Sequence, residues 1–364
     1  MTMKSLLLVV GIISVFSIIS VPVIGADSLT IEAVRAKSVL DDADFKAIDN
    51  FVAGAVGDML ETEDFSSISN TRAIIVANSA STQPNQTQFA DQFSKSAQKY
   101  ISAALTKAET LTLPARSFKV MTNLLMLTDA LADAHLADIA LKYADDKNQV
   151  IRYWAVHSVT NPDITEKLND PKETDAARRV IKRLDEVVAV SSPDVLGLIA
   201  SFAGSIKMPE GEALLLKVAD QRITSYANWT VERELTDAKI LQILCDKMTS
   251  SIATKDAIGK RFGQLLSYAS QRYIKGADYL GADQKEQLIS VLVETEQSCL
   301  SKITGKPRFD IKRAIEAGDI SALQKVYNGL FGDGTTAGEL SFNYGNADDG
   351  SPMKTPLLLS APPK

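Results

Sequence analysis

The sequence of 364 residues contains few of the side chains that most often carry chemistry. It has two histidines, two cysteines and two tryptophans, and aromatic residues make up 6% of the chain. No CxxC or HExxH spacing is present, so the common zinc motifs are missing. The chain also lacks GxSxG, GxxxxGK[ST] and a GxGxxG that follows a strand, which are motifs of hydrolases and nucleotide-binding proteins. We therefore expect no metal, no cofactor and no recognisable catalytic group.

Positive charge is also in short supply. Lysine and arginine number 39 against 45 aspartates and glutamates, which gives a formal net charge of −6. Nonspecific binding to nucleic acid requires a dense positive footprint. This balance argues against a nucleic-acid partner.

Long apolar runs are absent after the first residues, which contain one. Lys4 is followed by an uncharged apolar run over residues 6–21, and then by Pro22 and the small pair Gly25-Ala26. This order predicts a signal peptide over residues 1–26 and an exported, periplasmic or extracellular protein. The alternative is an uncleaved anchor, because the run approaches the roughly 20 residues that cross a bilayer. Pro22 and the small residues favour cleavage, so we expect no membrane contact beyond the export signal.

Residues 27–331 carry apolar side chains at the 3.6-residue period of helices in nearly every segment. Alternating β-branched runs with Asn-Gly turns are missing, which argues against strands. Prolines fall between the periodic segments, where helices are expected to begin or end. The sequence thus predicts an all-α region over 27–331. Residues 332–364 are rich in Gly, Asp, Ser and Pro, and they predict a flexible low-complexity C-terminal tail.

The stretch DDKNQVIRYWAVHSV, residues 145–159, holds one histidine and one tryptophan beside an arginine and two aspartates. On a helix over 149–160 one apolar face is formed, and its members are Val150, Ile151, Trp154, Ala155 and Val159. The preceding segment, 131–144, has an apolar face of its own. The two segments predict an antiparallel helical hairpin that turns at residues 145–148.

Asp146, Ile151, Arg152 and Ala155 have the spacing of the second half of a HEAT repeat, and residues 131–161 resemble that family. The resemblance implies that Asp146 and Arg152 form a structural pair at the turn, as aspartates and arginines do in the ladders of HEAT repeats. It also implies an irregular HEAT-like α-solenoid of stacked helical hairpins. Further segment pairs at uneven spacings are compatible with such degenerate repeats.

Two groups of residues allow a chemical interpretation, and a structural one is favoured for both. His157 could serve as a base or metal ligand together with His135, but further ligands at a suitable spacing are lacking. Glu232 and Glu234 beside Trp229 could form a sugar-binding acid pair. We favour solvent-exposed acids at the start of a helix, where they complement its dipole.

Cys245 and Cys299 are the only cysteines, and each lies in an apolar helical pattern. An exported protein with an even number of cysteines can form a disulfide. Buried free thiols are equally ordinary in such helices. The sequence leaves both states open.

Taken together, these patterns predict an exported, non-enzymatic binding or scaffold protein that presents a helical-repeat surface to a protein partner. The alternative is a secreted enzyme on an α/α-helical scaffold that acts on an extracellular polymer, with catalytic carboxylates that the sequence does not single out.

Overall fold

The computed structural model describes residues 24–250, 255–333, 336–345 and 351–363. Within these ranges the chain is helical without a strand, and Gly332 and Ala337 form an isolated bridge. The prediction of an all-α fold is confirmed. None of the helices in these ranges is both long enough and apolar enough to cross a membrane. Residues 1–23, most of the predicted signal peptide, lie outside the described residues, and export stays a prediction.

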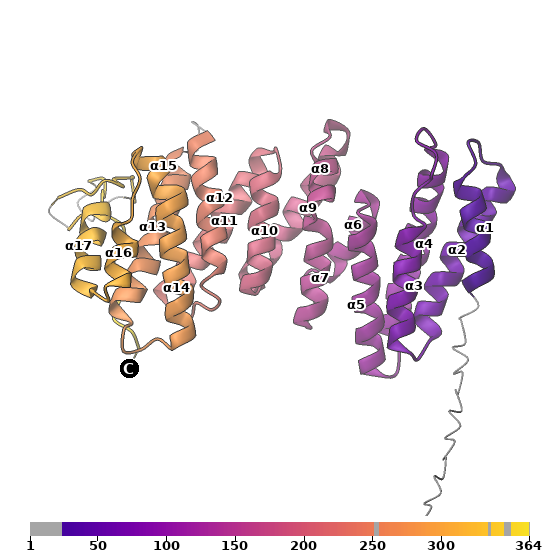
Figure 1. The fold of residues 1–364 in the computed structure, drawn as a ribbon, viewed down its shortest axis with the longest axis horizontal. Helices are drawn as coiled ribbons and strands as arrows, with labels where there is room; N and C mark the ends of the chain where they lie inside the picture. Colours follow the sequence, from indigo (N-terminus) through magenta and orange to yellow (C-terminus); the bar gives the residue numbers. More distant parts are fainter. Residues whose placement is uncertain (1–23, 251–254, 334–335, 346–350, 364) are drawn as a thin grey trace, which may run out of the picture.

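The helices alternate between two packed layers along an elongated row (Figure 1). In the first layer each helix packs on the next in the order α2 (Asp42–Glu61), α4 (Gln88–Glu109), α6 (Ala134–Ala140), α9 (Thr174–Val187), α11 (Pro209–Ala227), α13 (Lys255–Lys275) and α17 (Ile320–Phe331). The second layer is built in the same way from α3 (Phe65–Ala77), α5 (Pro114–Leu131), α7 (Gln149–Thr160), α10 (Pro193–Ser205), α12 (Thr236–Ser250), α14 (Ala282–Thr295) and α16 (Asp310–Glu316). Helix α1 (Ile24–Arg35) packs on α2, and α8 (Pro162–Leu168) lies beside α7.

The helix boundaries follow local chemistry. Pro114, Pro162, Pro193 and Pro209 each occupy the first turn of their helix, where a missing N–H costs nothing. Asp41 caps α2 by accepting hydrogen bonds from two backbone N–H groups of its first turn. Aliphatic side chains between the layers form one continuous core. Burial of this apolar surface is the main force that holds the hairpins together.

Helix α7 buries most of the predicted face, with one exception. Ile151, Ala155 and Val159 are buried as expected, and Trp154 is partly buried against the core. Val150, however, is 43% exposed, whereas Val156 is fully buried. The reason is that α7 packs on both α5 and α10, so its buried face is turned away from Val150.

The C-terminal segment is packed in its described parts, and this corrects the expectation of a flexible tail. It has no helix in those parts, but Leu340, Tyr344 and Leu359 are buried. The Gln264 side chain of α13 accepts a hydrogen bond from the Leu357 N–H (2.8 Å) and donates one to the Leu357 carbonyl (3.1 Å). The side chain amides of α13 thereby satisfy the backbone of an extended segment, in place of a strand partner.

Candidate functional site

A groove of about 540 Å³ opens where α7 and α10 begin and where the loop between α11 and α12 passes them. This edge lies low in Figure 1, at the end of α7 that is remote from α8. Helix α7 contributes Gln149, Val150, Arg152 and Tyr153 to the lining. The other walls are Val190, Ser191 and Ser192 from the turn before α10, Pro193 and Asp194 from its start, and Glu232 and Arg233 from the loop.

The first wall is set by the turn before α7. Asn148 caps the helix by accepting a hydrogen bond from the Val150 N–H at 2.9 Å. Asp146 in turn accepts one from the Asn148 N–H at 2.7 Å. These two bonds fix the entry of the chain into α7. They also orient the side chains of its first turns toward the groove.

The predicted pair between Asp146 and Arg152 is not formed. Asp146 is engaged by the backbone of the turn, and the buried Nε of Arg152 has no hydrogen-bond partner among the described residues. The turn is instead held by Arg183 of α9, which forms an ion pair with Asp145 (2.6 Å) and donates to the Leu141 carbonyl (3.3 Å). A turn aspartate and an arginine do meet, but the arginine comes from the next first-layer helix. Within the described chain, Arg152 is left as an uncompensated cation on the groove.

The opposite wall is a loop with a strained backbone. Trp229 and Arg233 have φ angles of 58° and 48°, in the left-handed region that side chains other than glycine rarely adopt. Such strain persists where the surroundings over-determine the conformation. Here the surroundings are two buried arginines that reach the loop from α11 and α13.

Arg222 of α11 is the first of these anchors. Its guanidinium binds both carboxylate oxygens of Asp237, at 2.7 and 2.8 Å, and also donates to the Glu232 carbonyl at 3.1 Å. Tyr226 donates its hydroxyl to the same carboxylate at 2.9 Å. The Arg222 and Asp237 side chains are 2% and 0% exposed. Burial alone would lower the pKa of Arg222, but the Asp237 carboxylate outweighs it and raises that pKa, so the arginine stays charged.

Arg272 of α13 is the second anchor. It forms an ion pair with Glu234 at 3.1 Å, and both side chains are 1% exposed. It also donates to the Val231 carbonyl at 3.4 Å and lies 5.2 Å from the centre of the Trp229 ring, a cation–π contact. The two arginines therefore bind consecutive loop carbonyls as well as acids, and they hold Glu232 and Arg233 at the groove.

The interpretation of Glu232 and Glu234 as two solvent-exposed acids is wrong for Glu234, which is buried against Arg272. Glu232 does line the groove. Trp229 is buried at 6% exposure and packs edge-on against Tyr279 at 5.5 Å, so it offers no open face for a sugar ring. The acid pair considered from the sequence is thus divided between the core and the surface.

The remaining predicted residues occupy other places. His157 contacts Asp129 at 2.9 Å and packs on Trp154, whereas His135 lines a separate groove between α4 and α6. Cys245 and Cys299 are both buried and unbonded. The described residues contain no group of three or more His, Cys, Asp or Glu placed to hold a metal ion.

The two arginines that line the groove differ in whether a described carboxylate pairs with them. Arg233 forms an ion pair with Asp194 at 3.4 Å, and both side chains are largely exposed. Arg152 has no such partner in the part of the chain that the structure describes, and Val150 and Val190 beside it are 43% and 59% exposed. The groove therefore combines a cation without a counter-charge in the described chain with accessible apolar surface. In comparisons with known proteins, neither a family model nor a curated sequence matches the chain.

Proposed function

We propose that this chain is an exported binding protein, a HEAT-like α-solenoid whose groove at α7, α10 and the α11–α12 loop takes a segment of a protein partner. The two-layer order of helices supports the solenoid, because each helix packs on the next one in its own layer and on adjacent helices of the other layer. The N-terminal residues predicted as a signal peptide support export.

The guanidinium of Arg152 carries the proposal of the binding site. It lines the groove without an ion-pair partner among the described residues, and a ligand carboxylate would supply the counter-charge in a bidentate geometry. Val150 and Val190 give such a ligand apolar contacts beside the charge. We therefore infer a partner segment with an acidic side chain flanked by apolar ones.

Site-specific photocrosslinking tests this site. A photoreactive amino acid at Val190 reports on the groove, and one at Ser94 on the first-layer side serves as the matched control. In the exported fraction of the source organism, Val190 should crosslink to one protein that Ser94 does not reach. Crosslinks from Ser94 alone, or none from Val190 across the exported proteins, would contradict the proposed site. N-terminal sequencing of the native protein should begin after Ala26.

The enzyme alternative has a defined test on the same groove. Its two carboxylates are Asp194, which is paired with Arg233, and Glu232. The purified protein is assayed for cleavage of extracellular polymers. An activity that is lost in Asp194→Asn and in Glu232→Gln would replace the binding proposal with a catalytic one.

A further inference from the structure

The two cysteines lie in one interface, although 53 residues separate them in the sequence. Cys245 belongs to α12, and Cys299 to η4 (Glu296–Leu300), a π-helical turn between α14 and α15 (Ser301–Thr304). Both side chains are fully buried, and α12 packs on η4. Neither residue takes part in the groove.

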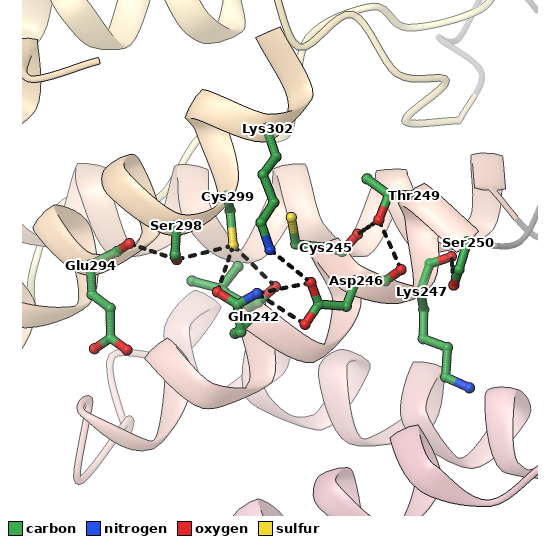
Figure 2. Close-up of polar contacts among 11 residues, drawn as sticks. Gln242, Cys245, Asp246, Lys247, Thr249, Ser250, Glu294, Ser298, Cys299 and Lys302 are labelled. Carbon is green, nitrogen blue, oxygen red and sulfur yellow. Dashed lines mark hydrogen bonds and ion pairs between the residues drawn. The ribbon is translucent and has the colours of Figure 1, made fainter. Parts of the chain in front are cut away.

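The contacts of Cys299 place its sulfur beside Cys245. Its Sγ lies 3.9 Å from the Leu241 carbonyl oxygen and 3.4 Å from Oε1 of Gln242. These residues precede Cys245 by four and three positions on α12, and a helical side chain leans toward that preceding turn. The Cys245 thiol therefore points at Cys299. Figure 2 shows the two sulfurs on facing sides of the α12–η4 interface.

The π-helical turn is also bonded to α16. Glu296 is fully buried in the same turn, and its carboxylate accepts hydrogen bonds from the N–H groups of Ile311 (2.8 Å) and Lys312 (3.0 Å) at the start of α16. Lys302 forms an ion pair with Asp246 at 3.2 Å across the same interface. A π turn inserts one residue into a helix and rotates the residues after it. Here it turns Glu296 toward α16 and Cys299 toward α12.

We propose that Cys245 and Cys299 form an intramolecular disulfide that joins α12 to η4. The oxidant is a disulfide, glutathione disulfide in vitro or a thiol oxidoreductase in the compartment that receives the exported chain. The thiolate of one cysteine, for example Cys299, attacks one sulfur of that disulfide and releases its partner as a thiol. Cys245 then loses its proton and attacks the Cys299 sulfur of the mixed disulfide, which releases the second thiol. Two cysteine thiols are oxidised and one disulfide is reduced, so protons and electrons balance.

Both sulfurs are inaccessible in the folded protein, so the exchange belongs to folding, before α12 and η4 close on each other. The contacts of the closed interface therefore do not decide which thiol attacks first, and the same bond forms in either order.

The test is refolding of the purified chain in a glutathione redox buffer. Reduced, denatured wild-type protein is refolded, its free thiols are alkylated in denaturant, and the monomer is analysed by mass spectrometry. We expect a mass about 2 Da below the reduced form, no alkylated cysteine, and a cystine peptide that links residues 245 and 299. Folded monomer with both thiols alkylated, or with glutathione adducts only, would overturn the proposal. The result does not depend on export, which is tested separately by N-terminal sequencing.

Variants provide the second readout. Closing a loop of about 50 residues should raise the Tm of oxidised wild-type protein above that of the reduced form by roughly 5 °C or more. Cys299→Ser and Cys245→Ser should each have the same Tm in oxidising and reducing buffer. A redox-dependent Tm that persists in the single variants would assign the effect to something other than this bond.

Discussion

Two neighbouring regions of the molecule use the same kinds of side chain in opposite ways. Around α6, α9 and α11, ion pairs bridge the first-layer helices at the surface: Arg179–Asp138 at 3.0 Å and Lys217–Asp185 at 2.7 Å have side chains that are each 45% or more exposed. Around the loop between α11 and α12, Arg222–Asp237 and Arg272–Glu234 are almost completely excluded from water.

The difference lies in what each pair is required to do. Exposed pairs are screened by water, and forming them restricts two long side chains. They therefore contribute little to the free energy of unfolding. Buried pairs are costly to desolvate, and they are tolerated because each charge is matched and because each arginine also binds a loop carbonyl. The buried pairs therefore set the conformation of the groove wall, whereas the exposed ones connect helices that the core already holds together.

The largest expected effect is that of Asp237→Asn. This change leaves the Arg222 charge buried without its counter-charge, so the free energy of unfolding should fall by about 3–5 kcal/mol. Urea denaturation followed by circular dichroism measures it. The double variant Arg222→Met/Asp237→Leu removes both charges and should recover most of the loss. A cost below about 1 kcal/mol for Asp237→Asn would show that the buried and exposed pairs are energetically alike.

A smaller effect is expected where the C-terminal segment packs on α13. A Cβ at Gly263 would lie 2.2 Å from the Tyr344 hydroxyl oxygen, which is buried and donates to the Leu340 carbonyl. Gly263→Ala should therefore lower the free energy of unfolding by about 1–2 kcal/mol and accelerate proteolysis of the segment. Gly57→Ala is the matched control, because it lies in α2 with open space around the new methyl group, and it should stabilise by about 0.5–1 kcal/mol. Equal effects of the two changes would contradict tight packing of the segment.

The half-buried pair of His157 and Asp129 should make a smaller, pH-dependent contribution to the free energy of unfolding. The hydrogen bond to Asp129 raises the pKa of His157, and this outweighs burial. Burial opposes ionisation of Asp129, but His157 and Asn161 lower its pKa. The histidine's contribution is thus complete below its unfolded pKa of about 6.5 and is lost as pH rises through the folded pKa. The aspartate's contribution disappears as pH falls below about 4.

Comparison of wild type with His157→Gln measures this contribution. The difference in free energy of unfolding should be at most about 1 kcal/mol near pH 5–6, and it should shrink toward pH 8. A difference in free energy of unfolding that grows with pH would contradict a stabilising ion pair between His157 and Asp129.

The smallest effect is expected for Arg179→Ala. Its pair with Asp138 is exposed on both sides. The free energy of unfolding should change by less than about 0.5 kcal/mol, and the change should vanish in 1 M salt. A loss comparable to that of Asp237→Asn would remove the contrast between the two regions.

Local patterns in the sequence were sufficient to predict the helices. The 3.6-residue period and the prolines at first turns predicted all-α structure, and the described residues bear it out. The partners of charged residues could not be predicted in this way. The sequence pointed to Asp146 and Arg152, six residues apart, whereas the turn is tied by Asp145 and Arg183, 38 residues apart. Glu234 was misjudged for the same reason, because Arg272 lies on another helix.

The C-terminal segment was beyond such patterns as well. Its contacts come from Gln264 and Gln271 of α13, which hydrogen-bond the backbone of Leu357 and Leu359. Backbone recognition of an extended segment leaves no periodic signal in its side chains. Composition indicated a loop, and only the partner surface reveals that the loop is packed.

The most direct test of the proposed binding site is the dissociation constant of the partner captured through Val190, measured for wild type, Arg152→Ala and Arg178→Ala. Arg178 carries the same charge on α9, where it is exposed and paired with Glu210. Arg152→Ala should raise the Kd about 10-fold or more while the Tm stays within about 1 °C, because the Arg152 Nε has no partner to lose within the described chain. Arg178→Ala should leave both values unchanged. An unchanged Kd for Arg152→Ala, or a Tm that falls together with binding, would contradict the assignment of this groove as the binding site.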